Sequence, residues 1–178
     1  MKTPLTYGFG LFLGGALVML LCYLLGYHND LARFQTGQTF AMVAGISVMV
    51  VALVLGMKAV RSESPTQSLS YGRAVGTGTL ISTFSGVMSA VFTYVYGTLI
   101  NPEYHQLMYE FQVSKVAEQM TSSQIEQAEP MMRFFTGPLW IAIAQVVFSP
   151  IMGVIVSLIV ALFMKRPPKD TPPAVPAA

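Results

Sequence analysis

The stretch that decides the fold is residues 74–90, AVGTGTLISTFSGVMSA, an apolar segment in which every fourth residue is small. Read at intervals of four, this row, which we call the small-residue stripe, consists of Ala74, Gly78, Ser82, Gly86 and Ala90. Inside a lipid bilayer, small side chains let two helix backbones approach closely, and the resulting van der Waals contact drives their association. The stripe therefore predicts a helix-packing face within a membrane.

The composition supports a membrane protein. Of the 178 residues, 53% are hydrophobic and only 10% are charged, whereas about 25% of the residues in an ordinary soluble domain are charged. The formal net charge of +2 is too small to favour nucleic-acid binding. The single cysteine, Cys22, has no second cysteine in the chain with which to form a disulfide. We expect a protein whose main partner is the lipid bilayer, and no nucleic-acid partner.

Four stretches are long and apolar enough to cross a bilayer, which takes about 20 apolar helical residues. The predicted spans are residues 7–27, 38–57, 72–100 and 138–164. The first span follows Lys2 as a signal peptide would, but its apolar run is too long and lacks a cleavage site, so we expect it to be retained. Residues 1–165 are therefore predicted to form an all-α, four-helix transmembrane bundle.

The segment between the third and fourth spans is too long and too polar for a simple turn. Residues 103–129 are predicted to be helical, with a break near Thr121, since Ser123 and Glu126 form a capping-box pattern. The second of these helices is expected to end before Pro130, and the whole segment to form a bent cap over the ends of the spans. Residues 166–178 are rich in proline, which predicts a disordered tail.

Basic residues are divided unequally between the connections. Seven of the ten Lys and Arg residues lie before the first span, around the second connection or after the fourth span. Because short loops rich in Lys and Arg stay in the cytoplasm, both termini are predicted to be cytoplasmic.

Two further features suggest how the helices pack. Gly10 and Gly14 form a GxxxG pattern in the first span, which is a plausible mate for the stripe, although the mate could also belong to a second protomer. In the fourth span, Pro150 lacks an amide proton, so a kink is expected there. Gln145 and Ser149 beside it are candidates for a polar path through the membrane.

Sequence patterns of enzymes and metal sites are not found, among them HExxH, GxSxG and a phosphate-binding glycine loop. Four residues of the outer segment could be imagined around a divalent cation, but their helical angles scatter them: Glu103, His105, Glu110 and Glu118. His28 near Asp30 is interpreted as a polar turn. We predict no catalytic, cofactor-binding or metal-binding residues.

Three helix-boundary motifs carry a family resemblance: GMKAVR at 56–61, LSYGRAVGTG at 69–78 and INPEY at 100–104. Over about residues 5–165 the chain resembles a bacterial membrane family catalogued as domain of unknown function 4199 (DUF4199). The resemblance implies a four-helix integral protein of a bacterial inner membrane. It implies no activity, substrate or catalytic residue.

The leading hypothesis is a non-catalytic, multi-pass inner-membrane protein that packs through helix faces and acts as a scaffold or accessory subunit, either as a homo-oligomer or with a membrane-protein partner. The alternative is a component of a small-solute or ion transporter or channel that acts as an oligomer, since four spans leave little room for a path within one protomer.

Overall fold

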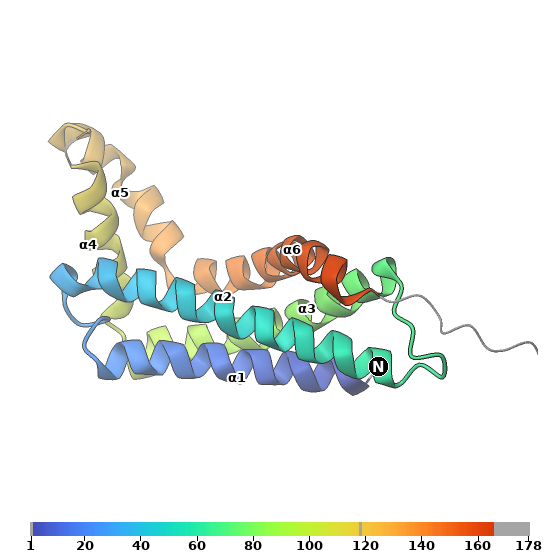
Figure 1. Ribbon diagram of the computed structural model, residues 1–178. Coiled ribbons are helices and arrows are strands. Elements are labelled where there is room, and N and C mark those ends of the chain that lie inside the picture. Colours follow the sequence, from blue (N-terminus) through green and yellow to red (C-terminus); the bar gives the residue numbers. More distant parts are fainter. Residues whose placement is uncertain (1, 118, 166–178) are drawn as a thin grey trace, which may run out of the picture.

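The computed structural model describes residues 2–117 and 119–165, and these are mostly helical (Figure 1). Among them, four helices are long and apolar enough to cross a membrane. The long helices are α1 (Lys2–Leu24), α2 (Leu31–Ser62), α3 (Tyr71–Val95) with its π-helical continuation η1 (Tyr96–Ile100), and α6 (Pro138–Met164). The shorter helices α4 (Tyr104–Val116) and α5 (Ser122–Thr136) lie between them in sequence. The predicted all-α fold with a membrane-helix bundle is confirmed, while the predicted tail at 166–178 and Glu118 lie outside the described residues.

The long helices form one bundle with two different ends. At one end, which we call the terminal end, lie the start of α1, the connection between α2 and α3, and the end of α6 (Figure 1). At the opposite end, the hairpin end, α4 and α5 rise to one side of the bundle. The outward faces of the long helices are strongly apolar, as at Phe163, which is 82% exposed. Such faces are suited to contact with lipid.

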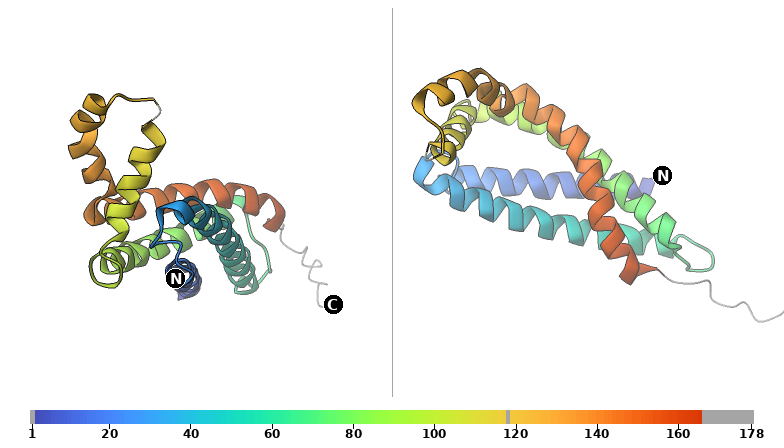
Figure 2. Two further views of the ribbon diagram at one scale, coloured as in Figure 1. Left: turned by 90° about the vertical axis from the view of Figure 1, so that its left-hand side faces the viewer. Right: turned by 90° about the horizontal axis from the view of Figure 1, so that it is seen from above.

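Helix α6 packs mainly on α3, and α1 and α2 lie side by side (Figure 2). A cluster of apolar side chains near the terminal end joins α2, α3 and α6, with Leu53, Ile81 and Ala161 fully buried in it. A second, aromatic cluster near the hairpin end contains Phe34, Tyr96 and Tyr104. Helix α1 also packs against α3, so α3 contacts both α6 and α1.

Helix α1 ends at a glycine that adopts the left-handed conformation. Gly26 has φ +76°, which costs a residue without a side chain little. The amide of Tyr27 donates to the carbonyl of Cys22 (2.9 Å), and that of Gly26 donates to the carbonyl of Tyr23 (2.9 Å). This Schellman pattern satisfies the last carbonyls of the helix, and it stops α1 before the predicted end at residue 27.

Helix α2 begins earlier than the predicted residue 38. The side chain of Asp30 caps it by accepting a hydrogen bond from the amide of Ala32 (2.9 Å). The first turns, LARFQTG, mix polar and apolar residues, so a hydropathy criterion excludes them. Phe34 within these turns is nevertheless fully buried.

Helices α4 and α5 correct the predicted cap in three respects. They form a hairpin that projects to one side (Figure 2, left) instead of lying over the ends of all the spans. The capping box lies two residues earlier than predicted, with Gln124 accepting from the amide of Thr121 (2.8 Å). Helix α5 also continues through Pro130 to Thr136. Glu126, whose carbonyl loses its amide donor to the proline, is exposed, so water can satisfy that carbonyl.

Candidate functional site

The small-residue stripe lies against α6. All five of its residues are buried: Ala74, Gly78, Ser82, Gly86 and Ala90. The facing side of α6 carries its own row of small residues at intervals of four, namely Ser149, Gly153, Ser157 and Ala161. Two rows at this spacing allow the two backbones to approach closely. The stripe is therefore occupied by another helix of the same chain.

Glycines of one row face serines of the other row. A Cβ atom on Gly78 would overlap the side chain of Ser157, and one on Gly153 would overlap Ser82. A Cβ on Gly86 would overlap Ser149 and would also lie 3.1 Å from the backbone carbonyl oxygen of Gln145. The contact thus depends on the absence of glycine side chains on both helices.

The glycines of the first span do not supply the mate, and this expectation is corrected. Gly10 is exposed, and a Cβ on it would meet nothing within 4 Å. Gly14 faces Val48 of α2. Helix α1 contacts α3 instead at Gly8, where a Cβ would lie 2.8 Å from the carbonyl oxygen of Ile81. The row on α6 was readable in the sequence as small residues at intervals of four, but Pro150 within it had suggested a kink instead.

Helix α6 is a single helix that continues through Pro150. The hydroxyl of Ser149 lies 3.5 Å from the side-chain oxygen of Gln145, one turn earlier. Gln145 and Ser149 both line a cavity, and Pro150 is not among its lining residues.

This cavity, of about 280 Å³, lies among the four long helices. Its polar lining comes from α3 and α6, and its remaining walls come from α1, α2 and α6, at Leu11, Gly15, Gly45, Met49, Phe148 and Met152. The polar residues that line it are Ser82, Ser85, Ser89, Gln145 and Ser149. The sequence had singled out Gln145 and Ser149, and the fold places them beside three serines of α3. We call this site the serine cavity.

The chemistry of the serine cavity is that of neutral hydrogen-bonding groups. Its lining contains hydroxyls and one carboxamide and no charged side chain. Ser82 is 2% exposed, and its hydroxyl has no hydrogen-bond partner in the described structure. A buried hydroxyl without a partner costs about 1–3 kcal/mol, so the close contact of Ser82 with Gly153 carries this cost.

Comparison with known proteins assigns the chain to a family. The model of the family described as "Protein of unknown function (DUF4199)" matches residues 6–166. The chain belongs to this family. The match covers the four long helices and the α4–α5 hairpin. Only the first residues of α1 lie outside it. No curated protein and no solved structure matches the chain.

The DUF4199 chain carries a polar network where η1 meets the loop between α1 and α2. Nδ1 of His28 lies 2.7 Å from the hydroxyl of Tyr96. The side-chain amide of Asn101 donates to the carbonyl of His28 (3.1 Å) and to the Tyr96 hydroxyl (3.3 Å). His28 and Asn101 are buried, and Tyr96 is fully buried. The sequence interpretation of His28 as a polar turn missed this network, because Tyr96 and Asn101 are distant in the chain.

His28 should make this DUF4199 protein less stable at acidic pH than at neutral pH. Burial lowers the pKa of His28 below its ordinary value of 6.5, so the unfolded chain binds a proton more readily than the folded one. Stability is therefore full above pH 6.5 and falls as the pH drops toward the lowered pKa, by at most about 1.4 kcal/mol per pH unit. We expect a lower melting temperature at pH 5.5 than at pH 7.5.

The control for this prediction is His28→Gln, measured at the same two pH values in the same detergent. It should reduce the difference to the smaller part contributed by His105, whose pKa burial also lowers. An unchanged difference in the variant would contradict the role of His28.

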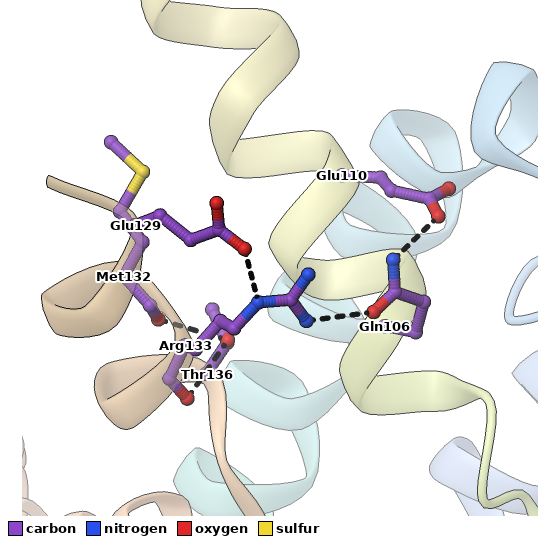
Figure 3. A network of polar contacts seen from close by, with 6 residues as sticks. All are labelled: Gln106, Glu110, Glu129, Met132, Arg133 and Thr136. Atoms are coloured by element: carbon purple, nitrogen blue, oxygen red, sulfur yellow. Dashed lines mark hydrogen bonds and ion pairs between the residues drawn. The ribbon is translucent and has the colours of Figure 1, made fainter. Parts of the chain in front are cut away.

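A second polar network joins the two helices of the DUF4199 hairpin (Figure 3). The guanidinium of Arg133 on α5 pairs with Glu129 (2.7 Å) and donates to the side chain of Gln106 on α4 (3.1 Å). It also lies 4.2 Å from the centre of the Tyr109 ring. Gln106 in turn donates to Glu110 (2.8 Å). One arginine therefore holds α4 and α5 in register at their bases.

His105 and Glu110 of the hairpin make separate hydrogen bonds and do not face a common site. His105 directs Nδ1 to the carbonyl of Thr136 (2.8 Å), and Glu110 is engaged by Gln106. Within residues 2–117 and 119–165, no three His, Cys, Asp or Glu side chains are grouped so that they could share a metal ion.

Proposed function

We propose that this DUF4199 protein is a non-catalytic, multi-pass protein of a bacterial inner membrane that serves as an accessory subunit or scaffold, docking a membrane partner through the α4–α5 hairpin. Both termini would lie in the cytoplasm. The basic residues at the terminal end support this orientation, among them Lys2, Lys58 and Arg73. Arg166 and Lys169, which also entered the charge count, lie outside the described residues.

The observation that carries the proposal is the hairpin itself. Helix–helix connections in bundles usually take about 2–8 residues, yet here two helices of 13 and 15 residues separate α3 from α6. The hairpin is braced by Arg133, and it presents exposed polar side chains on α4, such as Glu110 and Gln112. A short loop would be enough to connect α3 to α6. The presence of an ordered hairpin in its place supports a role in binding a partner protein.

The small-residue stripe is not available as a docking face for a partner. Because α6 covers the stripe within the same chain, close packing of a partner on that face would require α6 to leave. A partner must therefore engage a surface that the fold leaves open.

Site-specific photo-crosslinking in intact cells tests this proposal. A photoreactive residue at Gln112, exposed on α4, should give one discrete protein adduct. The same residue at Phe163, exposed on the outward face of α6, should give none of that mass. An adduct of twice the chain mass would identify a second copy as the partner. Absence of any adduct from Gln112 and from its neighbour Lys115 would contradict the proposal.

The serine cavity favours a second candidate function, a component of a small-solute transporter or channel. Its polar groups lie between helices that would be inside the membrane, where a solute needs such partners. If the cavity is part of a path, Gln145→Leu should reduce solute flux in proteoliposomes about tenfold, the equivalent of one lost hydrogen bond of about 1.4 kcal/mol.

The matched control is Gln35→Leu, which makes the same change at an exposed position of α2 outside the cavity. Equal flux in Gln145→Leu and the parent protein, with both variants folded, would reject the cavity as a path. The accessory role does not depend on that result.

A further inference from the structure

A second and larger hollow, of about 550 Å³, lies between α1 and α3 toward the terminal end. Its floor follows one face of α3 from Arg73 through Gly76 and Leu80 to Val87, and its sides come from α1 and the end of α2. We call it the terminal groove. It is separate from the serine cavity, with which it shares no lining residue.

The length of the terminal groove matches one leaflet of a bilayer. Residues 73–87 of α3 extend over about 21 Å at 1.5 Å per residue. Half of a bilayer, including its headgroup region, measures about 20–22 Å. With Arg73 at the level of the headgroups, a groove of this length would reach the level at which acyl chains end.

The interior of the groove is apolar. A Cβ on Gly76 would meet nothing within 4 Å, so this glycine leaves an open place in the floor. The two threonines in the lining bond back to their own helix, Thr77 to the carbonyl of Arg73 (2.8 Å) and Thr83 to that of Thr79 (2.8 Å). Their hydroxyl donors are thus already satisfied, and what they offer an occupant is largely methyl surface.

The mouth of the groove carries one charge of each sign. Arg73 and Glu63 both line it and both are exposed, yet no nitrogen of Arg73 lies within 4.0 Å of a Glu63 carboxylate oxygen. Glu63 accepts a hydrogen bond from the hydroxyl of Thr3 at one of its oxygens. The positive and negative groups therefore face the same opening without neutralising each other.

We propose that the terminal groove holds one phospholipid whose headgroup carries both a phosphate and a primary ammonium group, as an ethanolamine lipid does. Arg73 would bind the phosphate through its guanidinium, which matches phosphate geometry, and Glu63 would accept from the ammonium. One acyl chain lies along Gly76, Leu80 and Val87. This inference goes beyond the proposed accessory role, and it rests on the four long helices spanning a bilayer.

The charge pair selects this headgroup over two related ones. A glycerol headgroup offers a phosphate to Arg73 but no cation to Glu63, whose carboxylate then lies near a like charge. A choline headgroup has a cation but no N–H, so it cannot donate a hydrogen bond to Glu63. The ethanolamine headgroup satisfies both residues, since an ammonium group has hydrogen-bond donors.

Native mass spectrometry of the full chain, titrated with lipids of identical acyl chains, tests the proposal. The ethanolamine lipid should bind about tenfold more tightly than the choline lipid, the equivalent of about 1.4 kcal/mol. Glu63→Leu, which removes both the charge and the hydrogen-bond acceptor, should abolish that preference and should weaken binding of the choline lipid less than binding of the ethanolamine lipid. Arg73→Gln should weaken the binding of both the ethanolamine and the choline lipid. Gly76→Leu, which fills the floor, should weaken the binding of the ethanolamine, choline and glycerol lipids. The control Gly10→Leu, at an open position outside the groove, should leave the binding of all three unchanged.

Equal binding of the three lipids to the parent protein would overturn the proposal and would indicate ordinary annular lipid. A preference that persists in Glu63→Leu would also overturn it. Should Gly76→Leu fail to fold, the Glu63 and Arg73 variants decide the matter alone, since both residues are exposed. A protein adduct or its absence at Gln112 has no bearing on these outcomes.

Discussion

Gly86→Leu is expected to lower the melting temperature of the purified protein in detergent by roughly 5–10 °C, because overpacking a close helix contact costs about 1–3 kcal/mol or more. The obstacle at this position includes the backbone carbonyl oxygen of Gln145, 3.1 Å from where a Cβ would lie. A carbonyl within a helix cannot rotate away as a side chain can. The two helices must therefore separate to admit the leucine.

The matched control is Gly76→Leu, on the same helix, where a Cβ would meet nothing within 4 Å. It should melt within about 2 °C of the parent protein, since exposed substitutions usually change stability by no more than about 0.5 kcal/mol. Leu80→Ile, at a half-exposed position, serves as a second control. Similar melting temperatures for the Gly86 and Gly76 variants would show that the α3–α6 contact is not the tight one.

Tyr96→Phe is expected to destabilise the protein by about 1–3 kcal/mol, the cost of leaving buried polar groups without a partner. The substitution keeps the aromatic ring, which packs against Tyr23 and Tyr104. It removes only the hydroxyl, which lies 2.7 Å from Nδ1 of His28 and accepts from Asn101. Because this network joins η1 to the loop between α1 and α2, its loss should loosen the base of the hairpin.

Tyr94→Phe is the matched control, since Tyr94 lies two residues earlier on the same helix and is 46% exposed. Thermal melting would measure the global effect, and the rate of trypsin cleavage at Lys115 in α4 would measure the local one. Equal melting and cleavage for the two variants would mean that the buried hydroxyl contributes nothing.

Much of the fold could be predicted because it follows from local composition. The four apolar runs predicted four long helices, and the predicted limits of the fourth span, 138–164, coincide with α6. Helical segments of mixed polarity were harder to predict. The first turns of α2 carry Arg33 and Gln35 and become helical because Asp30 caps them and Phe34 is buried. Hydropathy does not report either effect.

Some features of the candidate site were likewise predictable from the sequence, and others were not. Gln145 and Ser149 stood out as polar residues in an apolar run, which is a property of the chain. Their placement beside Ser82, Ser85 and Ser89 around one cavity depends on how α6 is rotated against α3. The partners of His28 were likewise not predictable, since Tyr96 and Asn101 reach it only after α1, α2 and η1 have assembled.

Composition and spacing were enough to indicate helices suited to a bilayer and a stripe of small residues suited to close contact, and three helix-boundary motifs carried the resemblance to the family. Tertiary structure alone chose α6 as the mate of that stripe, turned the predicted cap into a sideways hairpin, and opened the serine cavity and the terminal groove. The reason is physical. Whether a segment is apolar or lacks side chains is a property of its own residues, whereas the depth to which two helices interlock depends on their relative rotation and shift. Those quantities emerge only when every helix in the bundle has found its neighbours.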